Sequence, residues 1–354
     1  MNDRRPEPQF DDSDTIGSVL AKKWRYDWRV TVWLFTKTAL GPLFIVWALF
    51  AVLDAFQQYG GSFAQIRSFQ LIVVHTAAVA VPAFGMTIII IAGGIDLSVG
   101  AAMALSATVG AWGFLHGHSP TEAVCLCLAT GLAAGILNGS LISSLRVVPF
   151  IVTLGTMMIF QGAGRWLAAD TPIRPPLASF APLADFQAPF PTPAWHIFSP
   201  GVWIMLLLAV AVSLVLRYTV FGRYVFALGS NEATARLCGI NVPLVRISVY
   251  ALGGLFAGVA GVYQFATLYQ GNPMGGVGKE LRIIAAVVVG GGSLSGGRGS
   301  VLGTLSGAAI MAVIDHGCTT LGIGDMYQDI LIGAIIVAAV AVDQYRQRKM
   351  AAAV

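Results

Sequence analysis

The chain has 354 residues, of which 56% are hydrophobic and only 11% are charged, and its net charge at pH 7 is +4. Its mean hydropathy of +0.76 lies well above that of soluble globular domains, which excludes an ordinary water-soluble enzyme or binding module. The modest positive charge is accounted for by basic residues at the membrane surface and by anionic lipids, and it gives no reason to expect nucleic acid as a partner.

Continuous apolar runs predict an all-α, polytopic membrane protein with about ten transmembrane helices, some of them interrupted by glycines. A helix needs about 20 mostly apolar residues to cross a hydrocarbon layer roughly 30 Å thick. Runs such as VWIMLLLAVAVSLVL lack the alternation of polar and apolar residues that is typical of barrel strands. The predicted spans cover residues 33–53, 70–92, 97–115, 121–144, 149–168, 201–217, 246–268, 281–292, 300–316 and 326–343.

The distribution of lysine and arginine predicts how these spans are oriented. If both termini are cytoplasmic, most of the 21 lysines and arginines fall on the cytoplasmic side, which is the bias that membrane insertion favours. The chain then comprises a cytoplasmic amino-terminal segment (1–29), a transmembrane domain (30–345) and a cytoplasmic tail (346–354). The first 29 residues are charged and polar, so we expect no secretory signal there.

Two longer polar segments interrupt the transmembrane domain. Residues 169–200 are rich in proline and aromatic side chains, which predicts an irregular external loop. Residues 218–245 fall on the cytoplasmic side and contain the stretch GSNEATARLCGI. This second segment is either a plain connector or a surface on which another protein docks.

The stretch GSNEATARLCGI carries the signals of a short helix. Ser230 or Asn231 can cap its start, and Glu232 would lie in its first turn, where a negative charge is favourable. Gly239 can adopt the left-handed conformation that commonly follows a helix end. We therefore expect a short, well-capped helix between two spans.

Two glycine-rich stretches break the apolar pattern: GGIDLSVG at residues 93–100 and VVVGGGSLSGGRGS at residues 287–300. Unpaired backbone groups inside a bilayer cost several kcal/mol each, so such breaks are expected next to a polar cavity or at the interface. Paired broken helices are typical of transport sites. Asp96 is expected either to cap the helix after the first break or to face a transport pathway. The break glycines are Gly93, Gly94, Gly100, Gly291, Gly292, Gly296 and Gly297.

Several motifs of soluble and membrane enzymes are missing from the sequence. It contains no GxxxxGK[ST], HExxH or GxSxG pattern, and its four cysteines lack zinc-ligand spacing, so we expect packing thiols and no metal site. These patterns favour a transport protein that does not itself hydrolyse ATP.

Four motifs then carry a resemblance. GMTIIIIAGGIDLSVGA, NGSLISSLRVVPFIVTLGTM, FGRYVFALGSNEATARLCGINV and IAAVVVGGGSLSGGRGSVLGT occur in this order over roughly residues 70–345. In sequence and spacing they resemble the ribose-type sugar permeases of the branched-chain amino-acid and ribose permease superfamily. Those proteins are the membrane subunits of bacterial importers powered by ATP-binding cassettes.

The resemblance implies a function and a set of partners. The chain would form the translocation pathway for a monosaccharide, a pentose or a hexose, in the bacterial cytoplasmic (inner) membrane. A second permease subunit, identical or paralogous, would complete the pore, and an external binding protein would deliver the sugar. ATP and Mg²⁺ would bind separate cytoplasmic ATPase subunits, so this chain would carry no cofactor of its own.

The resemblance also implies site residues. The residues expected to couple to the ATPase are Asn231, Glu232, Ala233, Ala235, Arg236 and Gly239. The candidates for the substrate pathway or its gate are Asp96, Ser98, Asn138 and Gln161, because hydroxyls and amides suit a neutral sugar.

One departure from the ribose-type pattern places the exact cargo in question. That pattern often reads acid, leucine, acid before the IAAVV run, whereas this chain has Glu280, Leu281 and Arg282. Glu280 is expected to pair with Arg282, and a surface pair would contribute at most about 1 kcal/mol. Two alternatives stay open: a permease for another small polar solute, such as a polyol or a sugar-derived signal, and an ion-coupled secondary transporter with Asp96 and Asp315 as ion sites.

Overall fold

A computed structural model describes residues 40–56, 61–176, 183, 186–188 and 198–351 of the chain. The predicted amino-terminal segment lies outside these residues, as do much of the predicted external loop and the side chains of the predicted tail. The helices are α2 (Leu40–Ala55), α3 (Ile66–Ile91), α4 (Val99–Leu115), α5 (Pro120–Leu145), α6 (Pro149–Leu167), α8 (Pro200–Tyr218), α9 (Val220–Ser230), α10 (Glu232–Leu237), α11 (Val242–Leu268), α12 (Lys279–Val289), α13 (Val301–Thr320) and α14 (Asp325–Ala351).

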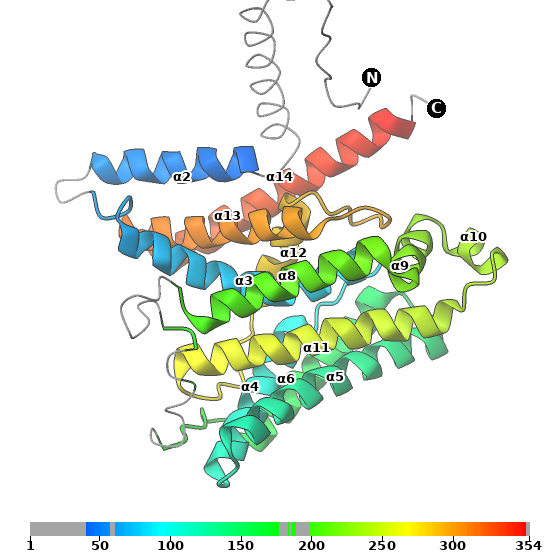
Figure 1. Cartoon of the computed structure of the whole chain (residues 1–354), viewed down its shortest axis with the longest axis horizontal. Helices are drawn as coiled ribbons and strands as arrows, with labels where there is room; N and C mark the ends of the chain where they lie inside the picture. The colour runs from blue at the N-terminus through cyan, green and yellow to red at the C-terminus, as the bar shows by residue number, and fades with distance from the viewer. Residues whose placement is uncertain (1–39, 57–60, 177–182, 184–185, 189–197, 352–354) are drawn as a thin grey trace, which may run out of the picture.

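The described residues fold into helices without a strand, as predicted (Figure 1). A helix lies at each of the ten predicted positions. Among the residues that the structure describes, five helices are long and apolar enough to cross a membrane by length and composition alone: α3, α5, α8, α11 and α13. Helix α12 has 11 residues, which corresponds to a length of about 16 Å, roughly half of the hydrocarbon layer. The multi-pass helical fold is thus confirmed, while the number of ten spans stays a prediction.

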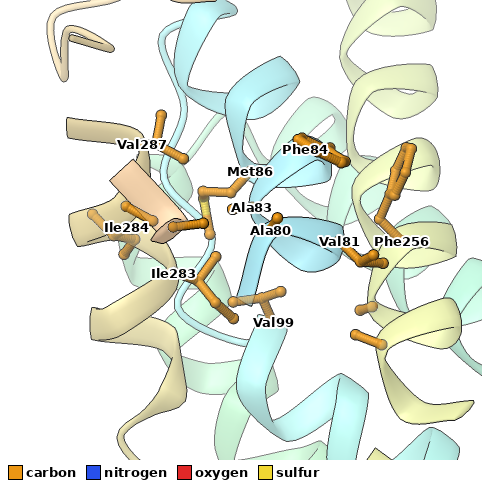
Figure 2. Close-up of a cluster of buried hydrophobic side chains, with 14 of the residues drawn as sticks. Ala80, Val81, Ala83, Phe84, Met86, Val99, Phe256, Ile283, Ile284 and Val287 are labelled. Carbon is orange, nitrogen blue, oxygen red and sulfur yellow. The ribbon is translucent and has the colours of Figure 1, made fainter. Parts of the chain in front are cut away.

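Helix α3 forms the centre of the bundle. All of its residues from Ala80 to Ile91 are buried. Figure 2 shows α3 between two neighbours: Phe84 meets Phe256 of α11, and on the opposite side lie side chains of α12 such as Ile284. A helix that is apolar on all faces is expected in such a central position, because each face contacts another helix.

Close packing of α5 against α11 uses small residues on both helices. Gly131 and Gly135 of α5 face Gly254 and Gly258 of α11 so closely that a Cβ atom at Gly131 would collide with the backbone of Gly254. Small residues at every fourth position allow this approach in membrane helices. The two segments ATGLAAGILNGSL and LGGLFAGVAGVY therefore pack against each other.

The start of the predicted external loop is hydrogen-bonded to the segment before α12. Ile173 and Gly271 exchange two backbone hydrogen bonds of 2.9 and 2.8 Å, and the Nε of Arg174 donates to the Oε1 of Gln270 at 2.9 Å. The described part of residues 169–200 otherwise contains little regular structure. This agrees with the irregular loop expected from its prolines.

Candidate functional site

Two short helices, α9 and α10, connect α8 to α11, and each is preceded by a single residue in extended conformation. Thr219 ends α8 and caps α9, where its side chain accepts a hydrogen bond from the backbone nitrogen of Gly222. Asn231 ends α9 and caps α10 by accepting from the backbone nitrogen of Thr234 at 2.9 Å. The predicted short helix is therefore α10, with Asn231 as its cap. Helix α9 was not predicted, although Gly222, Val225 and Leu228 form a buried stripe at helical spacing.

The end of α10 has the geometry that the sequence predicts for Gly239. Its φ angle is +80°, in the left-handed region. The nitrogen of Gly239 donates to the oxygen of Arg236, and the nitrogen of Ile240 donates to the oxygen of Ala235. This pair of hydrogen bonds is the Schellman motif, which satisfies the last free carbonyls of a helix.

The side chains of α10 divide into an anchored set and a presented set. Glu232 binds Arg236 at 2.9 Å and Arg246 of α11 at 2.6 Å, so it ties the short helix to the bundle. Ala235 is only 3% exposed, so its expected contact with a partner is wrong: it packs inside this chain because it lies on the inner face of α10. Ala233 is exposed, and Leu237, which the sequence analysis did not single out, is 88% exposed.

The two glycine-rich breaks meet each other beside the start of α10. The nitrogen of Gly297 donates to the oxygen of Ile91 at 2.8 Å. A Cβ on Gly229, which lies at the end of α9, would collide with that same Ile91 oxygen. Gly296 has a φ angle of +85°, and a Cβ there would lie 3.0 Å from the Cα of Gly93. Three segments far apart in the sequence are thus in backbone contact at the end of α9, directly before α10.

Glycine is required for a different structural reason at other positions of the breaks. Gly93 and Gly291 have positive φ angles of 81° and 92°. A Cβ on Gly94 would lie 2.5 Å from the hydroxyl of Tyr250. Gly100 does not belong to the break: it lies inside α4, where its lack of a side chain allows contact with Gly276. The prediction for Gly100 as a break residue is therefore wrong, and the amino ends of α4 and α12 meet at this point.

A buried polar network follows the first break. The Oδ1 of Asp96 accepts from the nitrogen of Ser98 at 2.8 Å and from its hydroxyl at 2.6 Å. The Nδ2 of Asn138 donates to the same hydroxyl at 2.7 Å. All three residues are at most 3% exposed. Ser98, not Asp96, is the residue that precedes the first turn of α4, so the expected cap is wrong: the carboxylate orders the turn before the helix instead.

The fourth pathway candidate lies apart from this network. Gln161 is half-buried on α6, and the residue of α6 that reaches the network is Thr153. Its hydroxyl donates to the oxygen of Ile95 at 3.3 Å and accepts from the nitrogen of Leu97 at 3.2 Å. The geometry thus joins Asp96, Ser98 and Asn138 but not Gln161.

A polar cavity of about 510 Å³ lies between α3, α11, α12 and the ends of α13 and α14. Its wall includes Gln264 and a charged cluster in which Arg282 is central. The Nη1 of Arg282 donates to both carboxylate oxygens of Asp315, at 2.8 and 2.9 Å, and its Nη2 donates to Asp329 at 3.0 Å.

The expected pair of Glu280 with Arg282 is therefore wrong. Glu280 turns back toward the start of its own helix, where its Oε1 accepts from the nitrogen of Gly278 at 3.2 Å. Its other oxygen lies beside Gly100 of α4. Arg282 points away from Glu280 and donates to the carboxylates of Asp315 and Asp329. The partners could not be read from the sequence because they lie 33 and 47 residues away.

Comparison with known proteins agrees with the four motifs. Residues 68–340 match the family described as branched-chain amino acid transport system / permease component. The ribose import permease protein RbsC of Escherichia coli strain K12 is 37% identical over 323 residues, which cover 89% of this chain and 95% of that protein. The fructose import permease protein FrcC of Rhizobium meliloti is 37% identical over 295 residues, 83% of this chain and 82% of its own.

A third relative, the galactose/methyl galactoside import permease protein MglC of Escherichia coli strain K12, is 32% identical over 330 residues, 87% of this chain and 96% of its own. No solved structure matches the chain. The family match and the relatives each cover more than two thirds of the sequence, and residues 68–340 contain all four motifs. The chain is therefore a multi-pass membrane protein that belongs to the family of permease components of branched-chain amino acid transport systems.

Proposed function

We propose that the chain is the permease subunit of an ATP-binding-cassette importer and forms the translocation pathway for a monosaccharide. The observation that carries this proposal is the similarity to the ribose import permease, which extends over 89% of the chain. The other relatives described above are import permeases for fructose and for galactose and methyl galactoside. All of these cargoes are uncharged monosaccharides or, in the case of methyl galactoside, an uncharged derivative of one.

The arrangement around α10 supports a docking role for this helix. A short element that is tied to the bundle by Glu232 and still presents Leu237 can bind a partner without losing its own position. Since the end of α9 contacts both glycine-rich breaks, a displacement of α9 and α10 would act directly on the end of α3 and on the break between α12 and α13. This is the kind of rigid coupling that converts movement of one subunit into movement of another.

The proposal assigns the remaining parts to other chains. ATP and Mg²⁺ bind cytoplasmic ATPase subunits, a second permease subunit completes the pore, and an external binding protein delivers the sugar. Both termini and α10 lie in the cytoplasm, and the chain crosses the membrane ten times. An ion-coupled transporter is less well supported, because Asp96 and Asp315 are each engaged with a partner inside the chain.

Reconstituted uptake tests this proposal. The chain is placed in proteoliposomes with and without its ATPase and binding protein, and uptake of radiolabelled ribose, fructose, galactose and a set of polyols is measured. We expect ATP-dependent uptake that requires both partners. Uptake driven by an ion gradient in the presence of this chain alone would overturn the importer.

The same assay tests the docking surface. Leu237→Asp places a charge where an exposed leucine would enter an ATPase groove, and we expect uptake to fall at least tenfold while membrane insertion is unchanged. Cys238→Ser, a conservative change at the exposed neighbouring residue, is the matched control and should leave uptake unchanged. Equal uptake by the Leu237 variant would remove α10 as the docking element.

A further inference from the structure

We infer that the cavity of about 510 Å³ lined by Gln264, Arg282 and Asp315 binds the transported solute, and that it selects an uncharged polyhydroxy compound. This inference rests on the proposed function, and it assigns the binding to residues other than the four pathway candidates taken from the sequence. The volume lies within the range of about 300–1,000 Å³ that is typical of small-molecule sites.

Gln264 is the first argument. Its side chain lines the cavity, the residue is 5% exposed, and neither atom of its amide has a hydrogen-bond partner among the described residues. A buried polar group without a partner is unfavourable, because it has lost its hydrogen bonds to water. An amide offers one donor and one acceptor group, which is the combination that a hydroxyl can satisfy.

The segment that covers Gln264 has room for the amide only because of a glycine. A Cβ on Gly275 would collide with the Nε2 of Gln264. Gly275 belongs to the turn between Asn272 and Gly278, which precedes α12 and contacts the start of α4 at Gly100. A solute reaches the amide when this turn shifts, so binding at Gln264 is tied to the position of α12.

Charge compensation is the second argument, and it sets the class of solute. The guanidinium of Arg282 is held by Asp315 and Asp329, so the principal cation of the wall is already neutralised within the chain. The cavity is lined by the three carboxylates of Asp315, Asp325 and Asp329 against the cations Lys279 and Arg282. An acidic sugar or a free amino-acid carboxylate would meet this excess of negative charge.

The same pair can still bind hydroxyls. Arg282 and Asp315 are 28% and 23% exposed at their side chains, and Arg282 makes the described bonds through its two Nη atoms. Its Nε hydrogen and the remaining lone pairs of Asp315 therefore stay available. Hydrogen bonds to charged groups are stronger than those between neutral groups, so a vicinal diol would bind well here without a charge of its own.

The experiment uses the complete importer in proteoliposomes, with labelled ribose, fructose and galactose as probes. Gln264→Leu is expected to lower the uptake rate of the transported sugar about tenfold at saturating binding protein. Gln187→Leu is the matched control, because Gln187 is also a buried amide without a partner among the described residues but does not line the cavity. It should transport at close to the unmodified rate.

A second measurement reports binding directly. Thr267 is exposed and lines the cavity, so Thr267→Cys, with Cys125 and Cys238 replaced by serine, can be labelled with a methanethiosulfonate reagent. We expect the transported sugar to slow labelling at least fivefold and galacturonate to leave it unchanged.

The outcomes separate the two proposals. The unmodified importer can take up a sugar while Gln264→Leu stays fully active and the sugar gives no protection at position 267. That combination would overturn the binding role of the cavity and leave the proposed importer function intact. Equal protection by galacturonate would overturn the selection for uncharged solutes. If the unmodified importer takes up none of the neutral sugars, the proposed function fails, and this inference fails with it.

Discussion

Arg282 lies in a helix of the bundle, and its position is explained by the carboxylates that surround it. An isolated cation inside a membrane protein is costly, so such side chains pair with carboxylates or face a polar cavity, and Arg282 does both. Asp315 depends equally on Arg282, since the arginine contacts both of its carboxylate oxygens. Removal of Arg282 leaves Asp315 without its cation, and removal of Asp315 leaves Arg282 with the more exposed Asp329 alone.

Removal of one member should therefore cost more than removal of both. We expect Arg282→Ala or Asp315→Ala to lower the free energy of unfolding by about 1–3 kcal/mol, because a partly buried charge loses its partner. The double variant should lose less than the sum of the two single losses, since the one carboxylate it leaves without Arg282, that of Asp329, is 73% exposed to solvent. Thermal unfolding in detergent measures all three, and strictly additive losses would show that the two residues act independently.

The cap and the carboxyl-terminal turn of α10 could be predicted from the sequence, whereas the partners of Arg282 could not. The Asn231 cap and the left-handed Gly239 depend on residues within one turn of each other, so the sequence contains the whole interaction. The burial of Ala235 depends on how α10 lies against the bundle. That orientation is a tertiary property, and the sequence analysis accordingly assigned Ala235 the wrong role.

At the scale of the elements, the junction of α9 with the two glycine-rich breaks is the most constrained part of the chain. Each break was predictable because glycines interrupt an apolar run, but the sequence gives no sign that residues near 92, 229 and 297 meet. Their meeting depends on backbone contact without side chains, as at Gly229 and Ile91. A methyl group at this point would have to displace either α3 or α9.

Gly229→Ala should therefore weaken the coupling between α9 and the breaks. We expect uptake to fall at least tenfold, with a lower thermal midpoint, because the new methyl group collides with the backbone of Ile91. Gly155→Ala is the matched control: Gly155 lies within α6 and has nothing within 4 Å of an added Cβ. Alanine is favoured over glycine in a helix by about 1 kcal/mol, so this variant should be at least as stable as the unmodified chain.

At the scale of the whole molecule, the sequence predicted which segments are helices far better than how they assemble. Each of the ten predicted helices could be located because an apolar run is visible in the sequence itself. The central position of α3 depends instead on its contacts with α11, α12 and α13, which are tertiary. The short length of α12 was expected from the predicted span 281–292, but the helix ends three residues before the end of that span, at Val289. Glycine ends it there.

The orientation of the molecule decides whether α10 can meet an ATPase, and exposed cysteines can test it. Cys125 and Cys238 are exposed, whereas Cys127 and Cys318 are buried. In a Cys125→Ser chain, Cys238 is the exposed reporter of the proposed cytoplasmic side. Thr121→Cys, in a chain with both exposed cysteines replaced by serine, reports the proposed external side. Residue 121 is exposed at the amino-terminal end of α5.

A membrane-impermeant maleimide should label Thr121→Cys in intact cells and should label Cys238 only after the membrane is permeabilised. The positive-inside distribution of lysine and arginine is the physical reason for this expectation. Sealed inside-out vesicles provide the control, because the order of labelling must reverse in them. Labelling of Cys238 in intact cells would place α10 outside the cell, where no ATP-hydrolysing subunit could drive it, and the importer would have to be abandoned together with the docking role of Leu237.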